Sequence, residues 1–529
     1  MKKLTKLLAL ALALVMALSL ATTTFAATII VDDEDVAGAE YGAYKLLSAT
    51  DLGDGKFTYA VNETYKTALL TVINSAEALT DEQIIEYIAA LQDDEIQDFA
   101  DAVYLLIKDL DPDYTTDTNK FTGVDQGYYM IVETETGSVE DFEEDTYSLV
   151  MLDTAGQEEI TVNTKEELPQ SDKKVKDAND TEGTVSDWQD SADHDIGDKV
   201  SFQITFTLPG KFDEFTTYYV GVHDIQAEGL TYNNDLVVTV NGDEDADLTE
   251  YFTYSAVAAD ACENDCTFHI ICTDIIAAAK AENISLEAGD KIVFNYTSTL
   301  NEDAEFGATG NPNEMTIEFS NNPYGDGTSE TPKDRVIVFT FKVDVDKYTT
   351  IDGNKTPLSG AGFTLYKEVA TKTADAKTGA EIKAELAALN AAIKAAALKD
   401  DAYYEIAAEV KVDAEGDTFS FEGVDDGNYV LVETTIPAGY NAWDAEEFTI
   451  SAEHDIESAQ PQLTQLTGGD LLTGYVNTGI LHGEIENKSG IELPETGGIG
   501  TTIFYIVGGL LAVAAVVLLV TKKRMASAE

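Results

Sequence analysis

The sequence predicts an all-β protein in which several β-sandwich domains follow one another, interrupted by short helical insertions. Strand-like alternation is the first observation, because every second side chain from 200 to 208 is apolar. A weak internal repeat is the second: residues 121–137 and 421–440 each contain a turn followed by an alternating run that includes Val-Glu-Thr. Length is the third, since 529 residues exceed what one hydrophobic core usually holds.

The first element is a predicted secretory signal peptide, residues 1–26. Three lysines lie within residues 1–6, residues 7–20 are almost wholly apolar, and residues 24–27 offer small side chains for cleavage. This order is typical of a leader that sends the rest of the chain out of the cell.

Three β-sandwich domains are predicted next, at residues 27–167, 168–331 and 332–490. Proline-containing boundaries near Leu168-Pro169 and Thr331-Pro332 separate them. The early strands 41–47 and 361–367 extend the repeat between the outer two domains. Helical insertions are expected in these outer domains, and the periodicity places them at 81–92, 98–110 and 380–399.

The last element is a predicted transmembrane helix at 503–520. This run carries no charge and is followed by Lys522, Lys523 and Arg524. A basic flank of this kind indicates the cytoplasmic side. Residues from about 27 to 490 are therefore expected outside the cell.

Composition excludes some functions. With 98 acidic and 32 basic residues the net charge is −66, so nucleic acid is not an expected partner. The odd number of cysteines, Cys262, Cys266 and Cys272, cannot form a full disulfide framework. A local disulfide or exposed thiols is favoured over a zinc site with the nearby His269, and neither a metal nor a cofactor is predicted.

A short motif lies just before the predicted span and consists of Leu493, Pro494, Glu495, Thr496 and Gly497. Followed by the span and the basic tail, this segment (491–529) resembles the LPXTG cell-wall sorting signal of Gram-positive surface proteins. Across most of its length the chain resembles the sortase-assembled backbone (major) pilins, isopeptide-forming fimbrial subunits built from immunoglobulin-like, collagen-adhesin B-type β-sandwich domains.

The resemblance implies a mode of assembly. A sortase transpeptidase cuts between Thr496 and Gly497, holds Thr496 as a thioester and transfers it to another copy of the chain, and the polymer ends on peptidoglycan at the cell surface. Minor tip or base pilins and a host surface ligand are further partners that such a family allows.

A pilin also needs an acceptor amine, and the family keeps a lysine at the end of its first domain. Here the strand-like segment 158–170 supplies Lys165, which alternation places on the polar face with Thr161 and Asn163. The family's tyrosine and proline before the lysine are absent. An ordinary surface lysine near a domain boundary is the alternative.

In the last domain, alternation directs three reactive side chains to one core. Lys347 continues the apolar face of 339–347, Glu433 lies on the apolar face of its strand, and Asn487 shares a face with Ile485. Burial should lower the pKa of Lys347 and leave a nucleophilic neutral amine. The resemblance implies that Lys347 attacks the Asn487 side chain to form an isopeptide bond, with Glu433 as the catalytic proton shuttle; a buried salt bridge is the alternative.

The middle domain offers a second set by the same reasoning: Lys173, Asp224 and Asn321 match the family's middle-domain triad. Lys174 and Asn322 are the rivals, because a bulge would change which side chains point inward. In the first domain Lys45 and Glu133 have the right pattern, but no asparagine accompanies them and no bond is predicted there.

Three functions compete. The first is a structural subunit of a covalent pilus shaft, joined through Thr496 and Lys165. The second is a monomeric wall-anchored adhesin. The third, an extracellular enzyme, is not expected, because the chain has five histidines and no nucleophile–base motif, and the bond-forming residues act once each.

Overall fold

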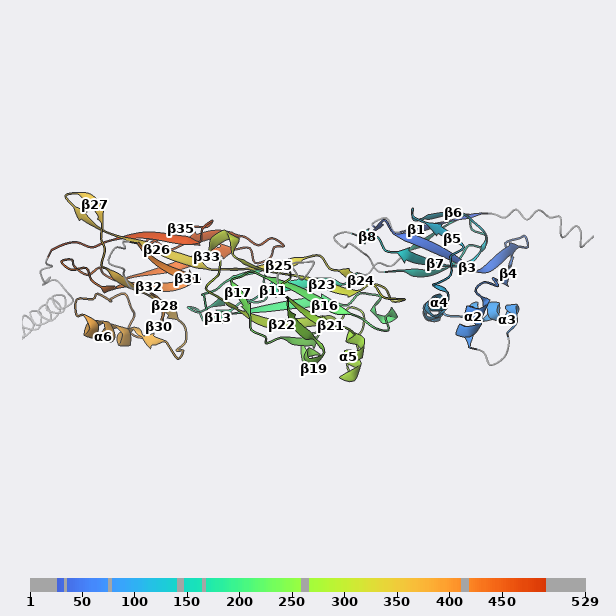
Figure 1. The fold of residues 1–529 in the computed structure, drawn as a ribbon, viewed down its shortest axis with the longest axis horizontal. Coiled ribbons are helices and arrows are strands. Elements are labelled where there is room, and N and C mark those ends of the chain that lie inside the picture. The colour runs from blue at the N-terminus through green and yellow to red at the C-terminus, as the bar shows by residue number, and fades with distance from the viewer. Residues whose placement is uncertain are drawn as a thin grey trace, which may run out of the picture.

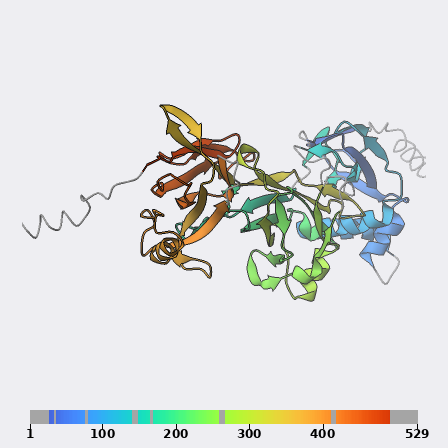
Figure 2. The same cartoon turned by 60° about the vertical axis from the view of Figure 1, so that its left-hand side comes forward.

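Three groups of β-sheets follow one another along an elongated molecule (Figures 1 and 2). The computed structural model describes residues 26–32, 36–74, 79–139, 147–163, 168–257, 266–410 and 418–490. No helix within these ranges is long and apolar enough to cross a membrane. The predicted signal peptide, sorting motif and span at 503–520 lie outside them.

The N-terminal group contains two main sheets, ordered β10-β1-β6 and β4-β3-β7-β9, with β5 on β3 and a separate β2–β8 pair. Strand β1 runs parallel to β10, and the other pairings are antiparallel. Its strands are β1 (Ala27–Asp32), β2 (Val36–Ala37), β3 (Glu40–Asp51), β4 (Phe57–Val61), β5 (Tyr114–Thr116), β6 (Lys120–Val124), β7 (Gly127–Glu135), β8 (Ser138–Val139), β9 (Leu149–Asp153) and β10 (Glu159–Asn163).

Helices α2 (Lys66–Ile73), α3 (Asp81–Ile88) and α4 (Asp93–Ile107) lie between β4 and β5. Helix α3 starts where the sequence predicts, because the Thr80 hydroxyl accepts from the Gln83 amide and the Gln83 side chain accepts from Thr80 in return. Helix α4 begins before the predicted 98, and α2 was not predicted. The apolar faces of these helices pack with β3, β4 and β7 in one core.

The middle group is a sandwich of two sheets, ordered β11-β15-β22-β18-β19 with β17 on β22, and β14-β25-β23-β16-β21-β20 with β24 on β23. Strand β25 belongs to this group, so its sheet extends past the predicted boundary at 331. The elements are β11 (Gln170–Val175), β12 (Ala178–Asn179), β13 (Thr184–Val185), β14 (Ser191–Asp193), β15 (Lys199–Thr207), η1 (Phe212–Glu214), β16 (Val220–Gln226), β17 (Leu230–Tyr232), β18 (Val237–Val240), β19 (Asp243–Asp247), η2 (Thr249–Tyr251), β20 (Thr253–Ala256), β21 (Phe268–Cys272), α5 (Ile275–Ala281), β22 (Lys291–Leu300), η3 (Gly307–Thr309), β23 (Asn311–Ser320), β24 (Thr328–Glu330) and β25 (Asp334–Phe339).

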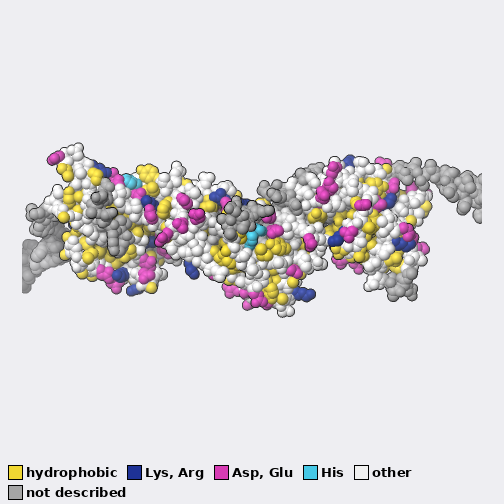
Figure 3. All heavy atoms as spheres, viewed as in Figure 1, with side chains coloured by type: hydrophobic (Ala, Val, Ile, Leu, Met, Phe, Trp, Pro, Cys, Tyr) yellow, Lys and Arg dark blue, Asp and Glu magenta, His cyan; other side chains and the backbone are white. Residues whose placement is uncertain are grey.

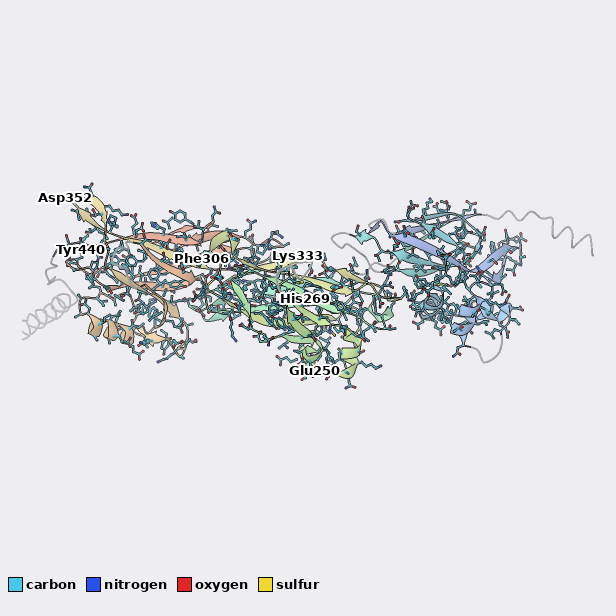
Figure 4. All side chains as sticks on the ribbon, in the orientation of Figure 1. Glu250, His269, Phe306, Lys333, Asp352 and Tyr440 are labelled. Atoms are coloured by element: carbon cyan, nitrogen blue, oxygen red, sulfur yellow. The ribbon has the colours of Figure 1, made fainter. Side chains whose placement is uncertain are left out.

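The C-terminal group is a second two-sheet sandwich, ordered β27-β26-β36-β35 with β31 on β26, and β29-β30-β28-β32-β33-β34. Its far end carries Asp352 and Tyr440 (Figure 4). The elements are β26 (Phe341–Ile351), β27 (Asn354–Pro357), β28 (Gly362–Val369), β29 (Lys377–Thr378), α6 (Gly379–Leu389), β30 (Tyr403–Val410), β31 (Thr418–Val424), β32 (Gly427–Thr435), β33 (Glu446–His454), β34 (Leu463–Thr467), β35 (Thr473–Tyr475) and β36 (Ile480–Glu486).

The internal repeat corresponds to the same arrangement in both outer groups. Strands β6 and β7 match β31 and β32, and the parallel pair β1–β10 matches β26–β36. In each copy a buried tyrosine donates its hydroxyl to a backbone carbonyl four residues earlier, Tyr129 to Asp125 and Tyr429 to Asp425. The turn quoted from the sequence is therefore held by the same hydrogen bond twice.

A tyrosine joins the N-terminal group to the middle group. The Tyr324 ring meets Tyr104 of α4 edge to face at 5.1 Å, and its hydroxyl donates to Asp101 at 3.0 Å. Lys108, also from the α4 end, donates to the Tyr324 carbonyl at 2.8 Å. This contact combines burial of an aromatic ring with satisfied polar groups.

The middle and C-terminal groups meet through a lysine and a backbone contact. Lys367 of β28 forms ion pairs with Asp180 and Asp195 of the middle group at 2.8 and 2.7 Å. In a separate contact between the same two groups, the short helix η3 donates from the Ala308 amide to the Val476 carbonyl at 3.0 Å. Phe306, which precedes η3, marks this place in Figure 4. We call this contact the C-terminal joint.

His454 adds a second ionic contact to the C-terminal joint. It ends β33, and its Nε2 lies 3.3 Å from Asp193 and 3.6 Å from Asp177. Burial alone would lower the pKa of His454, but hydrogen bonds and charges from the two aspartates outweigh it and raise the pKa to about 9. The imidazole is therefore charged at neutral pH.

Candidate functional site: two buried lysine clusters

The first cluster lies in the core of the C-terminal group and brings Lys347, Glu433 and Asn487 together, as alternation predicts. Lys347 is on β26, and Asn487 directly follows β36, the parallel neighbour of β26. Glu433 comes from β32 in the opposite sheet. All three side chains are buried.

The three side chains form a chain of hydrogen bonds. Lys347 Nζ donates to Asn487 Oδ1 at 2.5 Å, and Asn487 Nδ2 donates to Glu433 Oε1 at 2.6 Å. The same Glu433 oxygen is 3.5 Å from Lys347 Nζ. The other carboxylate oxygen accepts the Trp443 backbone amide at 2.7 Å, which fixes the carboxyl group in the core.

The surroundings favour a neutral amine at Lys347. Burial lowers the pKa of Lys347 to about 8, although the charge of Glu433 opposes this shift. The amine lies 5.1 Å from the centre of the Phe363 ring, which packs edge to face on Trp443. At pH 7 roughly one-tenth of the amine is then unprotonated and nucleophilic, far more than for a lysine with an ordinary pKa.

This arrangement can form an amide between two side chains. The Lys347 nitrogen would attack the Asn487 side-chain carbonyl carbon, the bond from that carbon to Nδ2 would break, and ammonia would leave. Glu433 contacts both nitrogens and can carry the proton from the amine to the leaving group. Folding holds the reactants in contact, an effect that reaches about 7 to 11 kcal/mol in well-oriented intramolecular reactions.

The second cluster lies in the core of the middle group around the Tyr296 hydroxyl. Lys173 Nζ of β11 donates to Asp224 Oδ2 of β16 at 2.6 Å and to Tyr296 of β22 at 3.0 Å. Tyr296 donates to the same Asp224 oxygen at 2.7 Å. Asn313 of β23 donates to Tyr296 at 3.0 Å and completes the set.

Charge is disfavoured at both ionisable members of this cluster. Burial lowers the pKa of Lys173 and raises the pKa of Asp224, while the attraction between them opposes both shifts. Asp224 Oδ1 and Asn313 Oδ1 are buried without a hydrogen-bond partner among the residues that the structure describes. Such atoms are costly to bury, so this core has reactive groups with unused hydrogen-bonding capacity.

The prediction of Asn321 for this cluster is wrong, and Asn313 occupies the place. Asp224 is paired with Met315 across β16 and β23, and Asn321 lies six residues further along the chain, about 20 Å away at strand spacing. Asn321 instead lies in the loop toward the N-terminal group, where its carbonyl accepts the Tyr147 amide. Alternation predicts the face of the strand on which Asn321 lies, but it does not predict how far along the strand Asn321 lies from Asp224.

The structure also shows where the two alternative residues, Lys174 and Asn322, lie. Lys174 reaches the surface side, where it binds Asp190 at 2.5 Å and Asp172 at 3.1 Å, so Lys173 is the buried amine. Asn322 accepts the Tyr324 amide at 2.9 Å in the same loop as Asn321. Neither asparagine of this loop approaches Lys173.

In the N-terminal group, where no bond is predicted, Lys45 and Glu133 are not brought together. Lys45 forms an ion pair with Asp125 at 3.1 Å, whereas the buried Glu133 accepts from the Ser148 amide. Lys45 faces Tyr129 across the strands as Lys367 faces Tyr429, so Lys45 corresponds to Lys367 and not to Lys347. In the matching registers the place of Lys347 falls on Asp33, outside the described residues.

Some of the predicted residues lie outside the described ranges. These are Lys165, Cys262 and the motif Leu493, Pro494, Glu495, Thr496 and Gly497. Cys266 is disulfide-bonded, which agrees with the preference for a local disulfide, and Cys272 is a free, buried thiol.

Two family models match parts of the chain and define its class. Residues 342–462, which include Lys347 and Glu433, match the prealbumin-like fold domain of SpaA type. Residues 485–527 match the LPXTG cell wall anchor motif of Gram-positive bacteria. The chain is therefore a cell-wall-anchored surface protein that carries a SpaA-type domain. This confirms the predicted localisation.

Particular relatives refine this class. Over 407 residues the chain is 26% identical to the trypsin-resistant surface T6 protein of Streptococcus pyogenes serotype M6, with 68% of this chain and 70% of that protein covered. The structure of the T6 backbone pilin, described as modular and three-domain, matches with a TM-score of 0.51 at 16% identity over 88% of this chain and 98% of that one. The full-length major pilin SpaD from Corynebacterium diphtheriae matches at 0.47 and 15%, over 88% and 98%. The sheets described above and the match to the T6 structure show the all-β fold of a backbone pilin, which confirms the predicted fold class.

Proposed function

We propose that the chain is the shaft subunit of a covalently polymerised surface pilus. A sortase would cleave after Thr496 and join its carbonyl to Lys165 of the next copy, and the finished polymer would be attached to peptidoglycan. The observation that carries the proposal is the buried Lys347–Glu433–Asn487 contact in a chain that also has the wall-anchor motif. A subunit under tension benefits from covalent cross-links that a monomeric adhesin needs less.

Two intramolecular isopeptide bonds belong to this proposal. Lys347 would bond to Asn487 with Glu433 as catalyst, and Lys173 to Asn313 with Asp224 as catalyst and Tyr296 as the hydroxyl that contacts all three. Each reaction consumes its own residues, so the protein acts once on itself and is not a turnover enzyme.

The test of polymerisation is the acceptor lysine. Lys165→Ala should convert the high-mass ladder of wall extracts under denaturing conditions into a single band, because the amine that receives Thr496 is gone. Lys120→Ala, which removes an exposed lysine of the same group, should leave the ladder intact.

An unchanged ladder in Lys165→Ala would mean that another lysine is the acceptor. A single band already in wild type would favour the monomeric adhesin. In both cases the wall-attached chain should still be detected, which shows that the variant folds and is exported.

A further inference from the structure

A cluster of sulfur and imidazole ligands lies on the outer face of the middle group, away from the Lys173 core. His223 of β16 and His269 of β21 face each other directly across the strands, and Cys266 precedes β21. One ligand atom from each of the three lies within 4.8 Å of the others. His269 is labelled in Figure 4, and imidazole atoms are visible on this part of the surface in Figure 3.

The three side chains lie close enough together to be ligands of one metal ion. Cys266 Sγ is 2.7 Å from His269 Nε2 and 3.8 Å from His223 Nδ1, and the two imidazole rings are 4.6 Å apart. A tetrahedral Zn²⁺ holds nitrogen and sulfur ligands roughly 3.5 Å from each other. The 3.8 Å distance is close to this spacing, whereas Cys266 Sγ and His269 Nε2 would have to separate by about 0.8 Å to hold the ion between them.

A carboxylate supports the ligand orientation of His223. Glu318 of β23 lies 3.4 Å from His223 Nε2, the ring nitrogen that points away from Cys266. A metal-bound histidine commonly donates its other N–H to a carboxylate, which leaves the inner nitrogen free to bind the ion. This contact assigns Nδ1 of His223 as the ligand atom.

We propose that His223, Cys266 and His269 form a binding site for a thiolate-preferring transition metal such as Zn²⁺, available when Cys266 is reduced. In the structure Cys266 is disulfide-bonded, and a disulfide sulfur is a poor ligand. A thiol reductant would convert the disulfide to two thiols while its own thiols are oxidised, and the Cys266 thiol would lose its proton on binding the metal. Three protein ligands leave one tetrahedral position for water or another donor.

The test uses Co²⁺ as a probe, because a thiolate bound to Co²⁺ produces a charge-transfer absorption band in the near ultraviolet. The purified full chain, reduced with a dithiol that is then removed, should show this band with one Co²⁺ per chain, and Zn²⁺ should displace it. The oxidised chain should show none. His269→Ala and His223→Ala should each abolish the band or weaken Co²⁺ binding at least tenfold.

Two further variants separate the site from general effects. Glu318→Gln should weaken binding by about tenfold, the usual cost of losing such an outer partner. His482→Gln, which changes a histidine of the C-terminal group, should bind as wild type does. Far-ultraviolet circular dichroism without metal checks that each variant is folded.

Absence of the band in the reduced chain would overturn the proposal. So would a band that persists at full strength in folded His223→Ala and His269→Ala, because the thiolate would then belong to another cysteine. The result does not depend on pilus assembly, which is read from wall extracts.

Discussion

At Lys347 the same burial that costs folding free energy also creates reactivity. An ammonium in this core would be expensive, and the pKa near 8 allows the neutral form to exist at neutral pH. Once an amide replaces the amine, no ionisable nitrogen remains there. We therefore expect the bond to remove the desolvation cost of a charged lysine as well as to cross-link the fold.

Glu433→Ala should prevent the bond at Lys347. Wild-type intact mass should fall short of the sequence mass by one ammonia for each bond formed, two in all, and Glu433→Ala should restore one. The bond closes a loop spanning 140 residues, so its loss should lower the free energy of unfolding by about 5 kcal/mol, by analogy with disulfides.

A matched control uses the corresponding carboxylate of the N-terminal group. Glu133→Gln changes a buried glutamate in the same repeat position, and within the described part of the chain its carboxylate accepts from the Ser148 amide, a contact that offers no amine and no amide side chain to react. Its mass should show the same deficit as wild type. An unaltered deficit in Glu433→Ala would instead show that the proposed proton shuttle is not needed.

Two asparagine variants test the bond in the middle cluster, one at Asn313 on β23 and one at Asn321 in the loop that follows this strand. Asn313→Ala should remove one ammonia deficit, because its amide is the one that meets Tyr296 beside Lys173. Asn321→Ala should leave both deficits in place. Mass spectrometry of peptides should show a cross-link between the peptides that contain Lys173 and Asn313, and a link to Asn321 would contradict the assignment.

Alternation along a strand shows which face a side chain occupies, and this accounts for what the sequence could predict. Lys347, Glu433 and Asn487 were found because each lies on an apolar face and only one combination was available. The prediction of Asn321 was wrong because alternation shows only the face of the strand on which a side chain lies. The position of that side chain along the neighbouring strand depends on the register of β16 and β23.

At the scale of elements, β26 and β36 are the first and last strands of the C-terminal group and lie side by side in parallel. Tension along the chain enters near β26 and leaves after β36. A bond between Lys347 and Asn487 joins these two strands directly. Force would then pass through the cross-link and not through the strands between them.

Single-molecule force spectroscopy can detect this path. The wild-type C-terminal group should not extend, whereas in Glu433→Ala it should unfold and lengthen by nearly its whole chain. Full extension of the wild-type group would show that the bond is absent or joins other residues. The N-terminal group, for which no bond is proposed, serves as an internal reference that extends in both proteins.

Helix α6 shows how tertiary packing overrides a local preference. The alanine-rich segment 380–399 predicts one helix, but α6 ends at Leu389. The Asn390 side chain accepts the Ala392 amide and forms a local turn that competes with the helix. The chain then turns so that Leu398 is fully buried in a core with Ile382 and Leu386, which a continuous helix would not allow.

At the scale of the whole molecule, acidic residues are spread widely over the face seen in Figure 3. The C-terminal joint concentrates the opposite charge: Lys367 and His454 each lie between carboxylates. A third carboxylate, Asp425, is 2.6 Å from Lys367. The joint thus contains two basic side chains, each surrounded by carboxyl groups.

The joint should weaken as pH rises. The pKa of His454 is raised from an ordinary 6.5 to about 9, so its stabilisation is fully present below about pH 6.5 and is lost through about pH 9. Burial, with repulsion from Asp193 and Asp177, raises the pKa of the nearby Asp426 to about 7, which acts in the same direction. At about 1.4 kcal/mol per pKa unit, His454 contributes at most about 3.5 kcal/mol.

Thermal unfolding measured across this pH range should show the loss in wild type and a much smaller change in His454→Gln. His482→Gln removes a half-exposed histidine that pairs with Asp346, and it should retain the wild-type pH dependence. An identical profile in wild type and His454→Gln would show that the contact of His454 with Asp177 and Asp193 does not stabilise the joint.

The close approach of η3 to the C-terminal group also has a mechanical consequence. A Cβ atom on Gly307 would lie 2.2 Å from the Gly479 nitrogen, so at this point two backbones touch without side chains between them. Backbone contacts of this kind resist bending more than contacts between long side chains do. In a fibre of such subunits the persistence length is set by the most compliant link, and we expect that link to lie elsewhere than at the C-terminal joint. Curvature of the fibre would therefore concentrate at the other links along the shaft, including those between successive subunits.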